Sequence, residues 1–242
     1  MVRALKGAII AAGRGERLRA AAGGIPKPLV DVNGVPMLLW QAAALRRAGA
    51  SPIVALVNSE TAVGLGARKV AIPPWLTVEV CDTANSMESL LALGAHLDCQ
   101  RFMLATVDAI AAPGALESFA AEAIARVEAA TTQRIDGALA ITRWRGDERP
   151  LFADSSGGII TRLGGAETAT VTAGFYMLPA SIFNYSARAR AEGLTAMRAF
   201  LSMLLEAGFR FAAIEVHGVV DVDEAADLDA ARAMLAAGGG TQ

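Results

Sequence analysis

Short apolar runs alternate with longer stretches of helical periodicity along nearly the whole chain. Continuous apolar runs are typical of strands that are covered on both faces, as the strands of parallel sheets are. The alternation therefore predicts an α/β chain with three layers, in which helices cover both faces of a mostly parallel, mixed central sheet. The expected strands are Ala8–Ala11, Ile53–Val57, Leu76–Val80, Phe102–Thr106, Gly137–Thr142, Thr172–Leu178 and Phe211–Val216, and the expected helices are 37–48, 86–97, 114–130 and 227–237.

The composition excludes several classes of protein. With 22 Lys and Arg against 24 Asp and Glu, the formal net charge is −2, which argues against a nucleic-acid-binding protein. The chain is 54% hydrophobic, but no run of about 20 residues is apolar enough to predict a membrane span. No linker, repeat or signal peptide is recognisable, so we expect one domain over residues 1–242 and a cytoplasmic protein. Both a monomer and a homo-oligomer stay open.

The first expected strand runs directly into a turn that is rich in glycine and arginine. Ala11 and Ala12 end the strand, and Gly13, Arg14 and Gly15 follow. Glycines let backbone N–H groups approach a ligand closely and arginine adds positive charge, so this turn suits a polyphosphate. The alternative is an ordinary strand-to-helix turn with solvated arginines.

A lysine between two prolines follows this turn. Pro26 and Pro28 fix the backbone on either side of Lys27. Because such a backbone holds the ammonium group in a defined place, the pattern favours a binding role over a role in solubility alone.

Taken together, these segments resemble the signature of nucleotidyltransferases that make sugar nucleotides and related activated compounds. The family pattern is Gly-x-Gly-x-Arg-Leu followed by Pro-Lys-Pro-Leu, and it is matched by Gly13, Gly15, Arg17, Leu18 and residues 26–29. The resemblance implies a three-layer Rossmann-like fold. It also implies transfer of a nucleoside monophosphate from an NTP to a small phosphorylated alcohol, such as a sugar 1-phosphate, inositol phosphate or phosphocholine, with release of pyrophosphate.

Three later segments occur in the order that this resemblance requires. Residues 102–108 resemble the strand that delivers the first metal-binding aspartate of the family, and residues 219–228 resemble the ending that brings the second. Between them, residues 172–176 resemble the strand beside the acceptor, which makes Gly174 an expected acceptor contact. The resemblance thus extends over most of the chain.

The resemblance also assigns roles to charged residues. It implies a Mg²⁺ site formed by Asp108 and Asp221, with Asp223 as a reserve ligand or a partner of one, because Mg²⁺ prefers carboxylate oxygens. Arg17 is expected to hold the leaving phosphates and Lys27 the transferred or acceptor phosphate, so that Arg17, Lys27 and Asp108 carry the catalysis. The alternative is that Asp108 only ends a strand and that Asp221 and Asp223 form a turn before the last helix.

The contacts to the base and the acceptor are expected in two further segments. Residues 81–90 resemble the Asn-x-x-x-Ser-Leu version of the motif found in cytidylyltransferases, which makes Thr83, Asn85 and Ser86 nucleotide-binding candidates, although the same residues could simply cap a helix. Arg162, at the end of an expected hairpin, is a candidate for the acceptor phosphate or else a solvated arginine on an edge strand.

Three other functions stay open. A molybdopterin-type nucleotidyltransferase suits the chain length, but such relatives usually lack the paired prolines. A non-catalytic nucleotide-binding regulator is suggested by Val107, where the family has glycine before the aspartate, and by the missing tryptophan before Asp221. A dinucleotide-binding oxidoreductase would need a third glycine where Leu18 stands.

Overall fold

The computed structural model describes residues 5–129, 134–144, 146 and 150–238. Among these residues, a central sheet contains nine strands in the order β5-β4-β1-β6-β11-β8-β12-β10-β9. The strands are β1 (Lys6–Ala11), β4 (Ile53–Val57), β5 (Leu76–Val80), β6 (Arg101–Thr106), β8 (Gly137–Arg143), β9 (Ala153–Ser156), β10 (Ile159–Leu163), β11 (Thr170–Pro179) and β12 (Phe211–Glu215).

The sheet is mixed but mostly parallel. Its first four strands in spatial order, β5, β4, β1 and β6, are parallel to their neighbours. Strand β11 is antiparallel to both β6 and β8, whereas β12 is again parallel to β8. The β9–β10 hairpin adds an antiparallel edge. This arrangement confirms the predicted fold class.

Helices cover both faces of the sheet. They are α1 (Glu16–Ala21), α2 (Met37–Arg47), α3 (Ser59–Ala67), α4 (Ser86–Leu93), α5 (Ala115–Glu128), α6 (Ser186–Ala191), α7 (Met197–Glu206) and α8 (Ala225–Gly238), with short 3₁₀ turns η1 (Lys27–Leu29), η2 (Gly94–His96) and η3 (Ala180–Tyr185).

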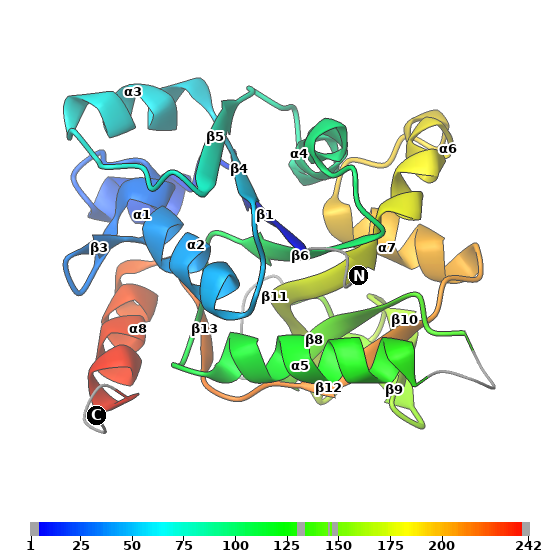
Figure 1. Ribbon diagram of the computed structural model, residues 1–242. Coiled ribbons are helices and arrows are strands. Elements are labelled where there is room, and N and C mark those ends of the chain that lie inside the picture. Colours follow the sequence, from blue (N-terminus) through cyan, green and yellow to red (C-terminus); the bar gives the residue numbers. More distant parts are fainter. Residues whose placement is uncertain (1–4, 130–133, 145, 147–149, 239–242) are drawn as a thin grey trace.

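Two separate cores lie on the two faces of the sheet. On one face, α2, α5 and α8 pack their apolar sides, including Leu38 and Phe119, against the strands. On the other face, α4, α6 and α7 do the same with side chains such as Leu90 and Phe200. Figure 1 shows these two groups of helices on opposite sides of the sheet. Every residue of β4 is buried, because helices cover the strand on both faces.

Two small two-stranded sheets complete the structure. Strand β7 (Ala109–Ala111), which directly follows β6, pairs antiparallel with β13 (Val219–Asp221). Strand β2 (Asp31–Val32) pairs with β3 (Val35–Pro36). The β7–β13 pair matters most here, since it brings the segment before the last helix next to the end of β6.

All seven expected strands are present in the structure, with small shifts at their ends. The expected helix 86–97 ends earlier as an α-helix and continues as the 3₁₀ turn η2. The expected helix 114–130 is observed as α5, and residue 130 lies outside the described part of the chain. Within the described residues, no helix has both the length and the apolar character needed to cross a membrane.

Candidate active site

The candidate site lies where β1 and β6 end at the same edge of the sheet. These strands are parallel neighbours, so the turns that follow them lie close together. The N–H of Val107 donates to the carbonyl of Ile10 (3.1 Å), and the N–H of Val222 donates to the carbonyl of Asp108 (3.0 Å). Backbone bonds therefore join the end of β1, the end of β6 and the segment after β13.

Three aspartates meet at this edge. Asp108, Asp221 and Asp223 each offer one carboxylate oxygen, and these oxygens all lie within 4.8 Å of one another. Asp108 comes from the turn between β6 and β7, while the other two follow through the β7–β13 pairing. The structure thus brings together the aspartates that the sequence placed far apart along the chain.

Lys27 joins two of these aspartates. Its Nζ donates to Asp108 Oδ2 (2.7 Å) and to Asp223 Oδ1 (2.6 Å), and only 6% of its side chain is exposed. Burial by itself would lower the pKa of Lys27, but the two carboxylates outweigh burial and raise that pKa above its ordinary value. The lysine is therefore a buried ammonium held by two carboxylates.

Gly15 makes room for this lysine. Its φ of +55° lies in the left-handed region, and a Cβ at this position would lie 2.5 Å from Cβ and 2.7 Å from Cδ of Lys27. No Cβ carried by an L residue fits there without moving the lysine. Gly13 differs, because a Cβ at its position would meet nothing within 4 Å. Its missing side chain leaves the turn open on that side.

Arg17 reaches the same cluster from α1. Its Nη2 donates to Asp223 Oδ2 (2.8 Å), and its Nη1 donates to Glu224 Oε1 (3.1 Å). The N–H groups of Asp223 and Glu224 both donate to Asp227 Oδ2, at 3.0 and 2.8 Å. Asp227 therefore orders the turn that carries the acidic partners of Arg17.

The charges of this group favour a divalent cation. Four carboxylates, those of Asp108, Asp221, Asp223 and Glu224, stand against two cations, so the formal sum is −2. Closely spaced carboxylate oxygens are the ligands that Mg²⁺ accepts. The residues present thus fit the metal that the sequence analysis expected.

Gly174 lies beneath the turn that carries Asp108. Strand β11 has an irregularity between Thr172 and Tyr176, and within it Gly174 has a φ of +74°. A Cβ at Gly174 would collide with Ala109 Cβ and would lie 2.7 Å from Thr106 Oγ1. This glycine therefore allows β11 to approach the end of β6 closely. Its expected contact with the acceptor stays a prediction.

The hydroxyl of Tyr176 is buried near the same cluster. Burial raises the pKa of Tyr176 to about 12, and the charges of Asp221 and Asp108 act in the same direction. A hydrogen bond with Thr172 opposes this shift. Tyr176 is thus held in its neutral form.

The side chains expected to contact the base make local hydrogen bonds. Asn85 Oδ1 accepts from the N–H of Glu88 (3.0 Å) and caps α4, which is the alternative role considered above. Thr83 Oγ1 lies 2.6 Å from Ser89 Oγ. Both side chains thus have a structural role in the first turn of α4, and their role in nucleotide binding stays a prediction.

Ser86 and Glu88 connect α4 to the neighbouring helices. Ser86 Oγ accepts from the N–H of Met197 at the start of α7 (3.0 Å). Glu88 accepts two hydrogen bonds from Arg190 of α6, at 2.9 and 2.7 Å. The start of α4 is therefore tied to α6 and α7.

Arg162 lies in the hairpin at the edge of the sheet. It stands opposite Asp154 in the register of β10 and β9, and its Nε and Nη2 donate to Asp154 Oδ2 at 2.7 and 2.6 Å. The structure does not bring Arg162 into the carboxylate cluster. Arg162 stands on β10, next to the edge strand β9, and its expected contact with the acceptor phosphate stays a prediction.

Two further polar residues make hydrogen bonds at this edge of the sheet, and one of them, Asn58, binds the chain directly before the glycine turn. Asn58 Nδ2 donates to the carbonyl of Ala12 (3.2 Å), while its Oδ1 caps α3. Asp82 accepts from the N–H (2.8 Å) and the hydroxyl (2.5 Å) of Ser59, and these hydrogen bonds lower the pKa of Asp82. Asn58 directly follows the expected strand 53–57, and Asp82 follows the expected strand 76–80 after one residue, which is the signal that could have identified them.

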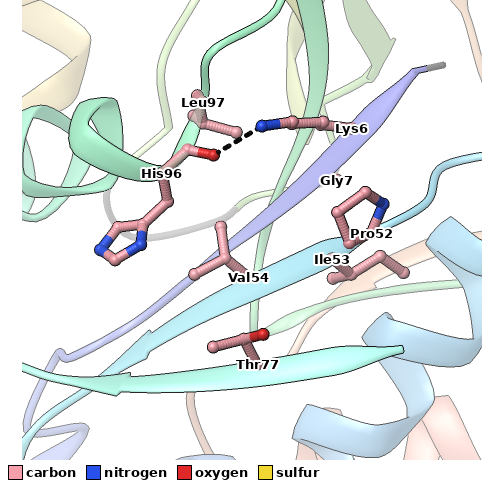
Figure 2. Close-up of a pocket in the computed structure, with 8 residues that line it drawn as sticks. All are labelled: Lys6, Gly7, Pro52, Ile53, Val54, Thr77, His96 and Leu97. Carbon is pink, nitrogen blue, oxygen red and sulfur yellow. Dashed lines mark hydrogen bonds between the residues drawn. The ribbon is translucent and has the colours of Figure 1, made fainter. Parts of the chain in front are cut away.

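A small open cavity of about 140 Å³ lies at the opposite edge of the sheet, where β1, β4 and β5 begin (Figure 2). Lys6, Thr77 and His96 are among the residues that line it, and Lys6 Nζ donates to the carbonyl of His96 (3.1 Å). None of the carboxylates described above lines this cavity. It is therefore separate from the candidate site.

Comparison with known proteins gives a consistent result. Residues 7–206 match the family model described as the MobA-like NTP transferase domain. A mannose-1-phosphate guanyltransferase of Pichia angusta is 45% identical over 65 residues, which are 27% of this chain and 18% of the relative. An N-acetylmuramate alpha-1-phosphate uridylyltransferase of Neisseria meningitidis serogroup B is 48% identical over 50 residues, which are 21% of this chain and 22% of the relative. These matches thus span about a fifth of each curated relative.

Solved structures match over almost the whole chain. The inositol-1-phosphate CTP transferase from T. maritima superposes with a TM-score of 0.74 at 16% identity, covering 96% of both chains. UDP-glucose pyrophosphorylase from Acinetobacter baumanii superposes with a TM-score of 0.74 at 16% identity, covering 94% of this chain and 92% of the other. At this level of identity, the likeness establishes the shared fold.

Proposed function

This chain belongs to the MobA-like NTP transferase family, and on that premise we propose that it transfers the nucleoside monophosphate of an NTP to a small phosphorylated alcohol. The observation that carries the proposal is the cluster of Asp108, Asp221 and Asp223 with Lys27 and Arg17 beside the glycine turn. The cluster brings together Arg17, from the Gly-x-Gly-x-Arg-Leu part of the family signature, and Lys27, from the Pro-Lys-Pro-Leu part.

The reaction needs the charges that this cluster provides. A phosphomonoester oxygen of the acceptor attacks the α-phosphorus of the NTP, the bond from that phosphorus to the bridging oxygen breaks, and pyrophosphate leaves with both electrons of that bond. Negative charge therefore grows on the leaving group. In our proposal, Arg17 binds the leaving phosphates and Lys27 binds the transferred or acceptor phosphate. Each charge-assisted contact is worth about 1.5–3 kcal/mol.

The aspartates have a separate task in this proposal. Asp108, with Asp221 and Asp223, would hold Mg²⁺ through carboxylate oxygens. A bound Mg²⁺ would supply positive charge at the phosphate oxygens and help to orient the triphosphate. Asp227 contributes indirectly, because it holds the backbone of residues 223 and 224 in place.

Several relatives favour a sugar or polyol phosphate as the acceptor. By their names, three of these proteins act on mannose 1-phosphate, N-acetylmuramate 1-phosphate and inositol 1-phosphate. Each of these acceptors carries a phosphomonoester on a polyhydroxylated ring. We propose an acceptor of this class. The motif at residues 81–90 favours CTP as the nucleotide, as in cytidylyltransferases.

The test is pyrophosphate release with Mg²⁺ and a matrix of substrates. Each of CTP, UTP, GTP and ATP is combined with mannose 1-phosphate, glucose 1-phosphate, inositol 1-phosphate, phosphocholine and molybdopterin. We expect turnover with one NTP and one acceptor class, and loss of turnover in Asp108→Asn and Lys27→Ala. Lys6→Ala is the matched control, because Lys6 lines the separate cavity at the other edge of the sheet.

Negative results would discriminate between the alternatives. Tight binding of an NTP without turnover in any combination would favour the non-catalytic regulator. Turnover only with molybdopterin would favour the molybdopterin-type enzyme. Thermal stabilisation by NADH and by none of the NTPs would contradict the proposal and favour the oxidoreductase.

A further inference from the structure

We propose that Lys27 is a built-in counter-ion that occupies the acidic cluster in the ligand-free protein and that a divalent cation displaces it. Lys27 Nζ lies 2.7 Å from Asp108 Oδ2 and 2.6 Å from Asp223 Oδ1. In this way the ammonium binds two of the three aspartates that are close enough together to share a metal ion. The inference rests on the proposed function in one respect only, namely that the displaced Lys27 ammonium then binds the phosphates of the NTP.

The ammonium and a metal ion compete for the same carboxylates. Mg²⁺ binds carboxylate oxygens at about 2.1 Å, so an ion bound to the two oxygens that Lys27 contacts would lie within about 5 Å of Nζ. Two cations this close in a partly buried site repel each other strongly. The lower energy is reached when the lysine gives up at least one of the two carboxylates.

The local structure restricts how the lysine can respond. Pro26 and Pro28 fix its backbone, and the side chain passes directly against Gly15. A change at Nζ must therefore come from rotation of the side chain, which carries the ammonium away from the carboxylates while the backbone stays in place. This is a local switch of one side chain and needs no movement of a domain.

Arg17 takes part in the same exchange. It binds the other oxygen of Asp223, Oδ2, at 2.8 Å. A metal ion that binds the carboxylate of Asp223 weakens the ion pairs of this carboxylate with both Lys27 and Arg17. The metal thereby releases two positive charges for phosphates, so metal and NTP should bind with positive coupling. By thermodynamic linkage, the coupling must be the same in both directions.

The direct test follows the lysine side chains by NMR. The chain has three lysines, Lys6, Lys27 and Lys69, so ¹³Cε-labelled lysine gives a simple spectrum. We expect Mg²⁺, added without nucleotide, to shift the Lys27 resonance in a saturable way and to leave those of Lys6 and Lys69 unchanged.

A second measurement tests the competition. We expect Lys27→Met to bind Mn²⁺ about tenfold or more tightly than the unmodified protein in calorimetry without nucleotide. Lys6→Met, which removes the same charge at the opposite edge, should bind Mn²⁺ with unchanged affinity. Folding is checked by thermal unfolding, where Lys27→Met should be less stable in EDTA and should gain more from Mn²⁺ than the unmodified protein does.

The outcomes separate this inference from the proposed function. A Lys27 resonance that stays in place while Mg²⁺ binds, or a Lys27→Met variant that binds Mn²⁺ no more tightly, overturns the exchange. Failure of both proteins to bind any divalent cation overturns the exchange and the metal site together. Conversely, a confirmed exchange in a protein that turns over no NTP would uphold this inference and refute the proposed function.

Discussion

The contact between Gly15 and Lys27 allows a test in which two neighbouring glycines give opposite results. In Gly15→Ala, the new residue must adopt a φ of +55°, and its Cβ would lie 2.5 Å from Cβ of Lys27. The left-handed conformation costs alanine about 1–2 kcal/mol. Overpacking against the lysine adds about 1–3 kcal/mol. We therefore expect the free energy of unfolding to fall by about 2–5 kcal/mol.

Gly13→Ala is the matched control. A Cβ at Gly13 meets nothing within 4 Å, and its φ lies outside the left-handed region. Alanine also restricts the unfolded chain, so we expect the free energy of unfolding to stay unchanged or to rise by up to about 1 kcal/mol. Both values come from urea titrations followed by circular dichroism. The two variants change the same number of atoms in the same turn.

Activity should separate the two variants in a different way. The alanine in Gly15→Ala displaces the stem of the Lys27 side chain, against which its Cβ would lie, and thereby moves the ammonium from the position from which it is proposed to bind a phosphate. We therefore expect kcat/KM to fall about ten- to a hundredfold even where the variant is fully folded. In Gly13→Ala, the added methyl group enters the open side of the turn, so any loss should appear in the KM for the NTP. The reasoning is refuted if Gly15→Ala keeps its stability within about 0.5 kcal/mol, or if Gly13→Ala loses as much stability as Gly15→Ala.

Three further predictions follow from other parts of the site. Tyr176 should titrate at about pH 12 by absorbance at 295 nm, because burial raises its pKa. The neutral tyrosine contributes about 2–3 kcal/mol to the free energy of unfolding, and this contribution is complete below pH 10, where the tyrosine of the unfolded chain ionises. The contribution is lost as the pH rises through 12. Tyr176→Phe should lack this fall in stability with pH. Asn85→Ala should destabilise the protein by about 1 kcal/mol through loss of the α4 cap, and a large rise in the KM for the NTP would show that Asn85 also binds nucleotide. Arg162→Ala should change stability by less than about 1 kcal/mol, because Arg162 pairs with Asp154 on the surface. A rise in the KM for the acceptor would support the role in acceptor binding that the sequence predicts, and an unchanged KM would refute it.

The strands and the aspartates could be predicted because both depend on local patterns. A strand buried on both faces must be apolar throughout, as Ile53–Val57 is, so its position is visible without knowledge of its neighbours. Asp108 follows the buried strand β6 after one residue, and the ends of parallel strands meet at one edge of a sheet. The same rule identifies Asn58, after β4, and Asp82, after β5, as residues of this edge.

The partners of the charged residues could not be predicted in this way. Nothing near Lys27 in the sequence indicates that it binds Asp108 and Asp223, because these contacts depend on the β7–β13 pairing. The pairing of Arg162 with Asp154 likewise follows from the register of a hairpin. The single domain and the choice of base and acceptor stay predictions, and both a monomer and a homo-oligomer stay open.

The contact at Gly15 gives a physical reason why the two halves of the signature occur together. A glycine turn alone is compatible with many strand-to-helix connections, and a lysine between prolines is compatible with many loops. In this fold, the lysine reaches the carboxylates at the end of β6 only because the glycine has no Cβ in its path. A larger residue at position 15 would block the lysine, and a shorter side chain at position 27 would leave the carboxylates without their counter-ion. The two motifs therefore act as one packing unit, and this is why the pair is a far more specific signal than either half.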